Sequence, residues 1–120
     1  MKIETHNIND TKIAEIIAEN IIIESVENGL DLLGNLYYQD FDSIILYEKN
    51  ITPHFFDLKT GIAGEILQKF SNYRVRLVIV GDYDQYQSKS IKDFIFESNK
   101  LRQINFVDAL PEALRRLSMI

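Results

Sequence analysis

The chain has 120 residues, of which 46% are hydrophobic and 26% charged, and this length is typical of one domain spanning residues 1–120. The composition excludes a disordered tail and a collagen-like fibre, and the absence of cysteine excludes disulfides, thiolate metal sites and a cysteine nucleophile. The net charge of −5 argues against non-specific nucleic-acid binding, because that affinity comes mainly from cationic side chains that neutralise phosphates.

The first part of the chain predicts a β-hairpin. Residues 2–8 and 11–18 have strand character, and the Asn9-Asp10 pair between them is typical of a tight turn. The short apolar stretch 21–23 is a candidate for a further strand.

A helix is predicted over residues 25–38. Ser25 is a good N-cap, and apolar residues follow at helical spacing. Because Tyr37 continues that spacing, we expect it in the core. The predicted buried face consists of Val26, Leu30, Leu33 and Tyr37.

The rest of the chain alternates short apolar runs with amphipathic segments. The predicted strands are 44–47, 75–80 and 104–107, and the predicted helices are 58–73, 90–101 and a C-terminal helix after residue 108. Strands separated by helices pair in parallel through right-handed crossovers. The sequence therefore predicts an α/β fold in β-β-α-β-α-β-α-β-α order, with helices packed against a mixed sheet of four to five strands.

Much of the chain resembles a bacterial family of single-domain proteins that is known only as domain of unknown function 4180. The resemblance implies no activity. The segments that carry it are 50–70, 72–75, 80–82, 88–90, 94–95, 97–100 and 102–106.

Two segments, 56–62 and 106–114, also resemble the STAS domain of anti-sigma factor antagonists and sulfate transporter tails. In that family a strand leads to phenylalanine, aspartate, one or two hydroxyl residues and glycine at the start of a helix. Lys59 stands where the antagonists have their phosphorylatable serine, and Thr60 fills the neighbouring hydroxyl position. The resemblance implies a STAS-like fold and a regulatory role.

The first candidate site is the predicted helix start at 57–64. A helix N-terminus favours anions, because its N–H groups are unpaired and the helix dipole is positive there. Lys59 adds a cation and Thr60 a hydroxyl, while Gly61 and Gly64 let a ligand or a partner backbone come close. The alternative is structural: Asp57 or Thr60 is only an N-cap, and the glycines serve helix packing.

The second candidate site is the loop 81–90, which follows the strand predicted at 75–80. Ligands in open α/β sheets bind beside the carboxyl ends of the strands, so Asp82, Ser88 and Ser90 are candidate contacts. The alternative is a solvated connection in which one serine caps the next helix.

The sequence supplies no catalytic residue, metal ligand set or cofactor motif. Its two histidines, His6 and His54, are too few for a typical metal site, and no nucleophile-elbow or dinucleotide-binding motif is present. The longest apolar runs are too short to span a membrane, and the acidic first residues do not form a signal peptide, so we expect a cytoplasmic protein.

The sequence favours a regulatory or scaffold module over an enzyme. We expect it to bind a protein partner or itself through the 57–64 helix start and the 81–90 loop. The alternative is a sensor or enzyme for a small anion or nucleotide that uses the same helix N-terminus.

Overall fold

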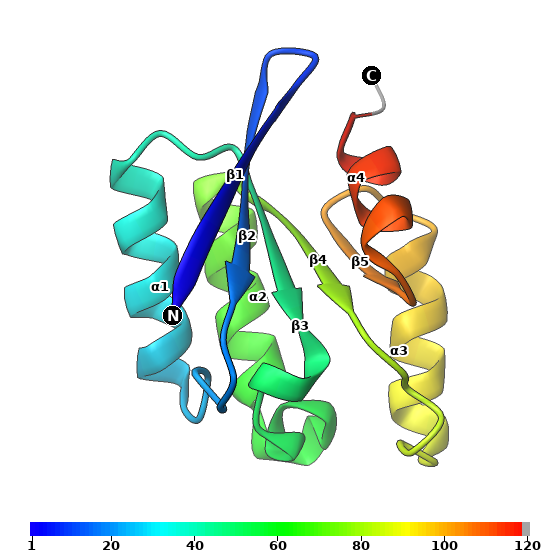
Figure 1. Cartoon of the computed structure of the whole chain (residues 1–120). Coiled ribbons are helices and arrows are strands. Elements are labelled where there is room, and N and C mark those ends of the chain that lie inside the picture. The colour runs from blue at the N-terminus through cyan, green and yellow to red at the C-terminus, as the bar shows by residue number, and fades with distance from the viewer. Residues whose placement is uncertain (119–120) are drawn as a thin grey trace.

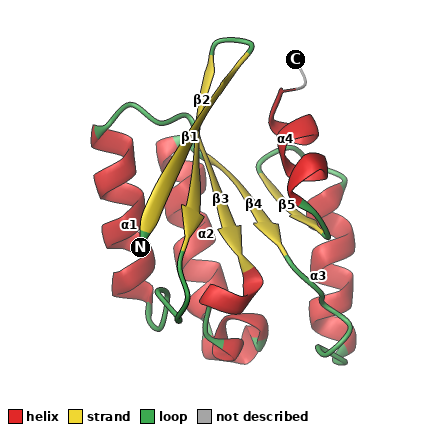
Figure 2. Ribbon diagram, viewed as in Figure 1, coloured by secondary structure: helices red, strands yellow, loops and turns green. Residues whose placement is uncertain are grey.

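A five-stranded β-sheet runs through the molecule, with α-helices on both of its faces (Figures 1 and 2). The structure is a computed structural model that describes residues 1–118. The strands are β1 (Lys2–Ile8), β2 (Thr11–Ile17), β3 (Ser43–Tyr47), β4 (Arg76–Val80) and β5 (Ile104–Val107). The helices are α1 (Val26–Tyr38), α2 (Ile62–Tyr73), α3 (Lys89–Asn99) and α4 (Leu110–Ser118). Three short 3-10 turns, η1 (Glu48–Asn50), η2 (Pro53–Phe56) and η3 (Leu58–Thr60), lie between β3 and α2.

The strands lie in the sheet in the same order as in the chain. β1 and β2 form the antiparallel hairpin, and β2 to β5 are parallel to one another. The predicted α/β class and mixed sheet are therefore confirmed. The apolar stretch 21–23 adds no strand to this sheet, because it forms only one isolated bridge, from Ile23 to Ile51.

Two apolar cores lie on the two faces of the sheet. A helix connects each of the parallel strands β2, β3 and β4 to the strand that lies next to it in the sheet. Because these crossovers are right-handed and run in one direction, α1, α2 and α3 lie on the same face. The larger core lies between these helices and the sheet. No strand follows α4 within the described residues, and this helix packs through Ala113 and Leu117 on the other face (Figure 1).

A buried carboxylate joins the hairpin to β3 on the α4 face. The carboxylate of Glu15 accepts a hydrogen bond of 2.7 Å from the hydroxyl of Tyr47, and its other oxygen lies 2.9 Å from Nε2 of His6. The side chain of Glu15 is only 7% exposed, so these two partners replace the water that the carboxylate has lost. Three neighbouring strands are thereby fixed in register.

The outer edge of β5 is occupied by a side chain of α3. The amide of Asn99 donates to the carbonyl of Phe106 at 3.0 Å and accepts from its backbone N–H at 2.8 Å. One side chain thus pairs both backbone groups that Phe106 turns away from β4.

The buried face of α1 is rotated from the predicted one. The structure buries Gly29, Leu32, Leu33 and Leu36. Tyr37 is 48% exposed, so its predicted place in the core is wrong. The reason lies in the contact between α1 and α2: a Cβ at Gly29 would stand 2.6 Å from Cδ1 of Ile66, and this close approach turns the Gly29 side of α1 inward.

Two helices begin at other residues than predicted. α2 begins at Ile62 instead of 58, because Gly61 has a left-handed φ of 79° and separates it from η3. α3 begins at Lys89 because Ser88, and not Ser90, is the N-cap, whose hydroxyl accepts from the N–H of Ile91 at 3.2 Å.

Substitution by alanine is expected to change the free energy of unfolding in opposite directions at Gly81 and at Gly64. A Cβ at Gly81 would lie 2.4 Å from Cβ of Glu48, so Gly81→Ala is expected to lower the free energy of unfolding by about 1–3 kcal/mol. Gly64 is helical and has open space around it, so Gly64→Ala is expected to raise that free energy by roughly 0.5–1 kcal/mol. Urea unfolding of both variants measures the difference, and equal effects would contradict it.

Candidate functional site

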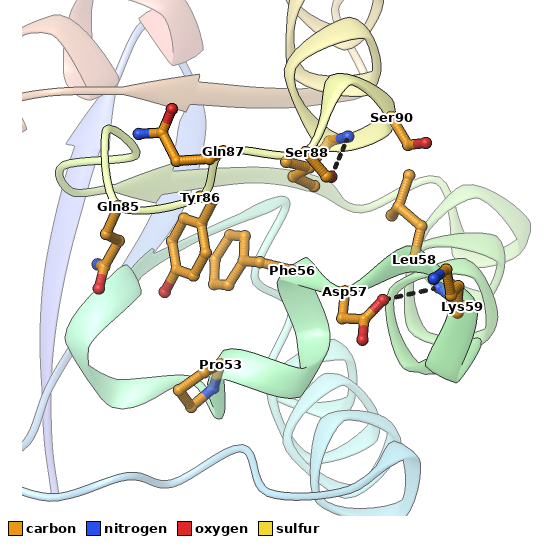
Figure 3. Close-up of a pocket in the computed structure, with 11 residues that line it drawn as sticks. Pro53, Phe56, Asp57, Leu58, Lys59, Gln85, Tyr86, Gln87, Ser88 and Ser90 are labelled. Carbon is orange, nitrogen blue, oxygen red and sulfur yellow. Dashed lines mark hydrogen bonds between the residues drawn. The ribbon is translucent and has the colours of Figure 1, made fainter.

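The two predicted segments meet at the carboxyl ends of β3 and β4. They enclose a cleft of about 450 Å³ between the η2–η3 turns and the loop that leads into α3 (Figure 3). The cleft lies at the carboxyl-terminal edge of the parallel strands, which is the edge where ligands bind in open α/β sheets, although the strand order has no switch at this point. Its lining residues are Pro53, Phe56, Asp57, Leu58, Lys59, Gln85, Tyr86, Gln87, Ser88, Ser90 and Ile91.

Two stacked rings form the aromatic part of the cleft. The rings of Phe56 and Tyr86 have centroids 4.4 Å apart and planes inclined by only 19°. Phe56 is buried, whereas Tyr86 is partly exposed. Tyr83 packs beside Phe56 at 6.0 Å, and its hydroxyl donates to the carbonyl of Ile79 in β4. The loop before α3 is therefore anchored to the sheet through its tyrosines.

Glu48 in η1 holds the same loop from the other side. One oxygen of its carboxylate accepts from the hydroxyl of Tyr86 at 2.8 Å and from Nε2 of Gln85 at 3.1 Å. Burial raises the pKa of Tyr86 and of Tyr83, and the nearby negative charge of Glu48 raises both further. Both phenols are thus kept neutral, as hydrogen-bond donors, at physiological pH.

The opposite wall of the cleft is fixed by turn-forming side chains. The carboxylate of Asp57 accepts from the N–H of Lys59 at 3.2 Å. The hydroxyl of Thr60 lies 2.8 Å from the carbonyl oxygen of His54 and 2.9 Å from that of Asp57. It also accepts from the N–H of Ile62, which begins α2. The ammonium group of Lys59 has no ion-pair partner within residues 1–118 and remains available to a ligand.

Four of the eight predicted site residues line the cleft, namely Asp57, Lys59, Ser88 and Ser90. Thr60 and Gly61 shape the turn behind it. Gly64 lies on the exposed side of α2, and the carboxylate of Asp82 accepts from the N–H of Asp84 within the loop. That any of these residues binds a ligand or partner stays a prediction.

The sequence reasoning missed the aromatic part of the cleft. The sequence leaves two alternatives open for Tyr38 and Phe41, which either cap the end of the first helix against the sheet or form an exposed apolar patch with Phe55 and Phe56. The structure buries Phe41, Phe55 and Phe56, and it leaves Tyr38, at the end of α1, 86% exposed. The sequence contains one signal of this aromatic part, namely the two tyrosines in the otherwise polar loop 82–88. Two large aromatic rings are unexpected in a loop that is fully solvated.

Uncharged side chains make up most of the lining of the cleft. Among the described residues that line it, only Asp57 and Lys59 are charged and none is a histidine. Within residues 1–118 no group of three or more histidine, aspartate or glutamate side chains is placed to hold a metal ion. No helix among the same residues has the length and apolar character needed to cross a membrane.

Comparison with known proteins gives one match. A protein-family model described as a domain of unknown function (DUF4180) matches residues 8–117. No curated protein matches the chain, and no solved structure matches it.

Alkaline pH is expected to destabilise the fold through its buried phenols. The pKa of Tyr47 is raised to about 12 by burial and by Glu15, and the pKa values of Tyr83 and Tyr86 are raised as well. Because the folded state keeps these phenols neutral, their contribution is full below the ordinary tyrosine pKa of about 10 and is lost progressively as pH rises above it, completely at about 12 for Tyr47 and at higher pH for Tyr83 and Tyr86.

Urea unfolding between about pH 8 and about pH 12 measures this loss. Tyr86→Phe is expected to make the loss shallower, and Tyr38→Phe, at a ring that is 86% exposed, is the matched control. A parallel decline in the wild type and in Tyr86→Phe would contradict the prediction.

Proposed function

Because this chain belongs to the family described as a domain of unknown function (DUF4180), whose description names no activity, we propose its function from its own geometry. The protein is a regulatory or scaffold module that binds a segment of a partner protein in the cleft between η2–η3 and the 82–88 loop.

The observation that carries this proposal is the meeting of the two segments in one prearranged cleft. Both walls are held by internal hydrogen bonds, from Glu48 to the loop and from Thr60 to the turn. A wall that is ordered before binding loses little conformational entropy when a partner arrives. The volume of about 450 Å³ suits one or two side chains of a partner.

The chemistry of the lining supports a protein segment as the occupant. Tyrosine is enriched among the residues that carry most of the energy of protein interfaces, and Tyr86 presents its partly exposed ring here. Around the rings stand uncharged donors and acceptors, from Gln85, Gln87 and Ser90, with one charge of each sign. We infer a partner segment with an apolar side chain for the aromatic surface and polar backbone groups for the rim.

A small anion or nucleotide is the second candidate, and one observation favours it. Lys59 lines the cleft from η3, and Ser88 and Ser90 line it from the start of α3, so that a cation and two hydroxyls belong to the same cleft. In this case the protein is a sensor of that anion. The resemblance of segment 56–62 to the STAS domain supports a regulatory role for either candidate, but Lys59 stands in place of the phosphorylatable serine, so this role does not include phosphorylation at that position.

Filling the cleft is expected to abolish partner binding. A photo-crosslinking residue at Gln87 is used to capture the partner from the cytosol of the source organism, and Ser90→Trp, which fills the cleft from an exposed position, is expected to reduce capture at least about tenfold. Asp31→Trp, at an exposed position of α1, is the matched control and is expected to leave capture unchanged.

Each of the two candidate functions has an outcome that would overturn it. Equal capture by the wild type and by Ser90→Trp would overturn the cleft as the partner surface. A thermal-shift screen of nucleotides and phosphorylated metabolites tests the anion, since a ligand that prefers the folded state raises its stability. A rise that Lys59→Ala removes would support the sensor, and no rise with any compound would exclude it.

A further inference from the structure

A second hollow lies at the opposite, amino-terminal edge of the parallel strands. It has a volume of about 330 Å³ and forms where the β1–β2 turn, the starts of β3 and β4 and the segment before β5 meet. We call it the arginine hollow. Its lining residues are Asp10, Thr11, Asp42, Ser43, Arg74, Arg76, Arg102 and Leu117.

Positive charge is concentrated around Arg76 in this hollow. The guanidinium of Arg76 is partly buried and donates from Nε to the carbonyl of Arg102 at 2.7 Å. Its pKa is lowered by burial and by the positive charges of Arg102 and Arg116. Arg76 forms no ion pair within residues 1–118. The guanidinium of Arg76 would therefore attract an anion that enters the hollow.

Arg74 reaches the same hollow from a strained backbone position. It follows α2 with a φ of 58°, in the left-handed region where glycine or asparagine is usual. Within the described residues, the other non-glycine residues with a positive φ are all asparagine or aspartate, namely Asn9, Asp10 and Asp40. An exposed arginine at such a position costs backbone energy, which points to a use for its side chain.

Ser43 places a hydroxyl group in the lining of the hollow. The residue is only 1% exposed, it lines the hollow, and no hydrogen bond to its hydroxyl is formed within residues 1–118. Ser43 is the β3 partner of Arg76 in β4, so that both side chains lie on the same face of the sheet. Because Oγ of Ser43 is not among the buried side-chain atoms that lack a partner, this hydroxyl is accessible and can pair with a ligand in the hollow.

Two aspartates limit what the hollow accepts. One oxygen of Asp42 accepts from the N–H of Lys12 at 2.8 Å, and Asp10 lies in the exposed β1–β2 turn. Neither forms an ion pair with Arg74 or Arg76. Their negative charges weaken the attraction of the hollow for any anion, and most of all for an extended polyanion such as a nucleic-acid backbone.

From these features we propose that the arginine hollow binds a single phosphate group, as inorganic phosphate or as part of a small phosphate ester. The guanidinium groups of Arg74 and Arg76 donate hydrogen bonds to its oxygens, and the hydroxyl of Ser43 completes the site. Guanidinium groups match phosphate geometry, and such charge-assisted hydrogen bonds are among the stronger ones in proteins. The site is independent of the cleft at the other edge of the sheet.

Titration with inorganic phosphate at constant ionic strength tests the proposal, with binding followed by the amide NMR signals of Ser43, Arg74 and Arg76. Arg74→Gly is expected to weaken binding about tenfold while raising the melting temperature, because glycine relaxes the left-handed position. Ser43→Ala is expected to weaken binding without lowering the melting temperature, because it removes an unpaired hydroxyl. Lost binding with preserved stability cannot be an effect of unfolding.

Two controls and a second probe complete the experiment. Lys59→Ala in the cleft and Lys2→Ala at the exposed start of β1 are expected to bind phosphate as the wild type does. Glycerol phosphate distinguishes the sources: tighter binding than phosphate identifies an ester as the natural ligand, and equal or weaker binding identifies free phosphate. Absence of saturable binding to both probes, unchanged affinity in Arg74→Gly, or loss of binding in Lys59→Ala would overturn the proposal.

Discussion

The constraint on which this structure depends is the sequential order of its parallel strands. Because β2, β3, β4 and β5 are neighbours in chain order, each crossover has the same hand and direction, and three helices share one face. The same order places the segment after β3 directly beside the segment after β4. The cleft is therefore a consequence of topology, and the stacking of Phe56 on Tyr86 joins its two walls.

The sequence predicted the α/β class because hydrophobic periodicity is a local property. It predicted the wrong face for α1 because Tyr37 and Leu36 both continue a helical spacing, and only the contact of Gly29 with Ile66 decides between them. The start of α2 depends on the left-handed φ of Gly61, which the residue type permits but does not require. Local patterns thus predict elements, while contacts between elements set their orientation.

The candidate sites show the same difference between features that local sequence predicts and features that depend on contacts between elements. Lys59 and Ser88 were identified because they lie at element boundaries, where the position in the chain predicts the position in the sheet. The stacking of Phe56 on Tyr86 joins residues 30 positions apart and has no local signature. The pairing of Ser43 with Arg76 depends on the register of two parallel strands, which is set by the packing of the helix between them. The arginine hollow was accordingly not predicted.

The contact of Asn99 with Phe106 has a consequence for how the protein behaves at high concentration. An open edge strand is a template on which another chain adds a strand, and this reaction leads to aggregation. At β5 the amide of Asn99 already occupies the donor and the acceptor that an added strand would need first. At the other edge, β1 exposes Lys2 and Glu4, whose charges oppose the same reaction. Extension of the sheet is thus blocked at Phe106 of β5, whereas at β1 it is opposed only by charge.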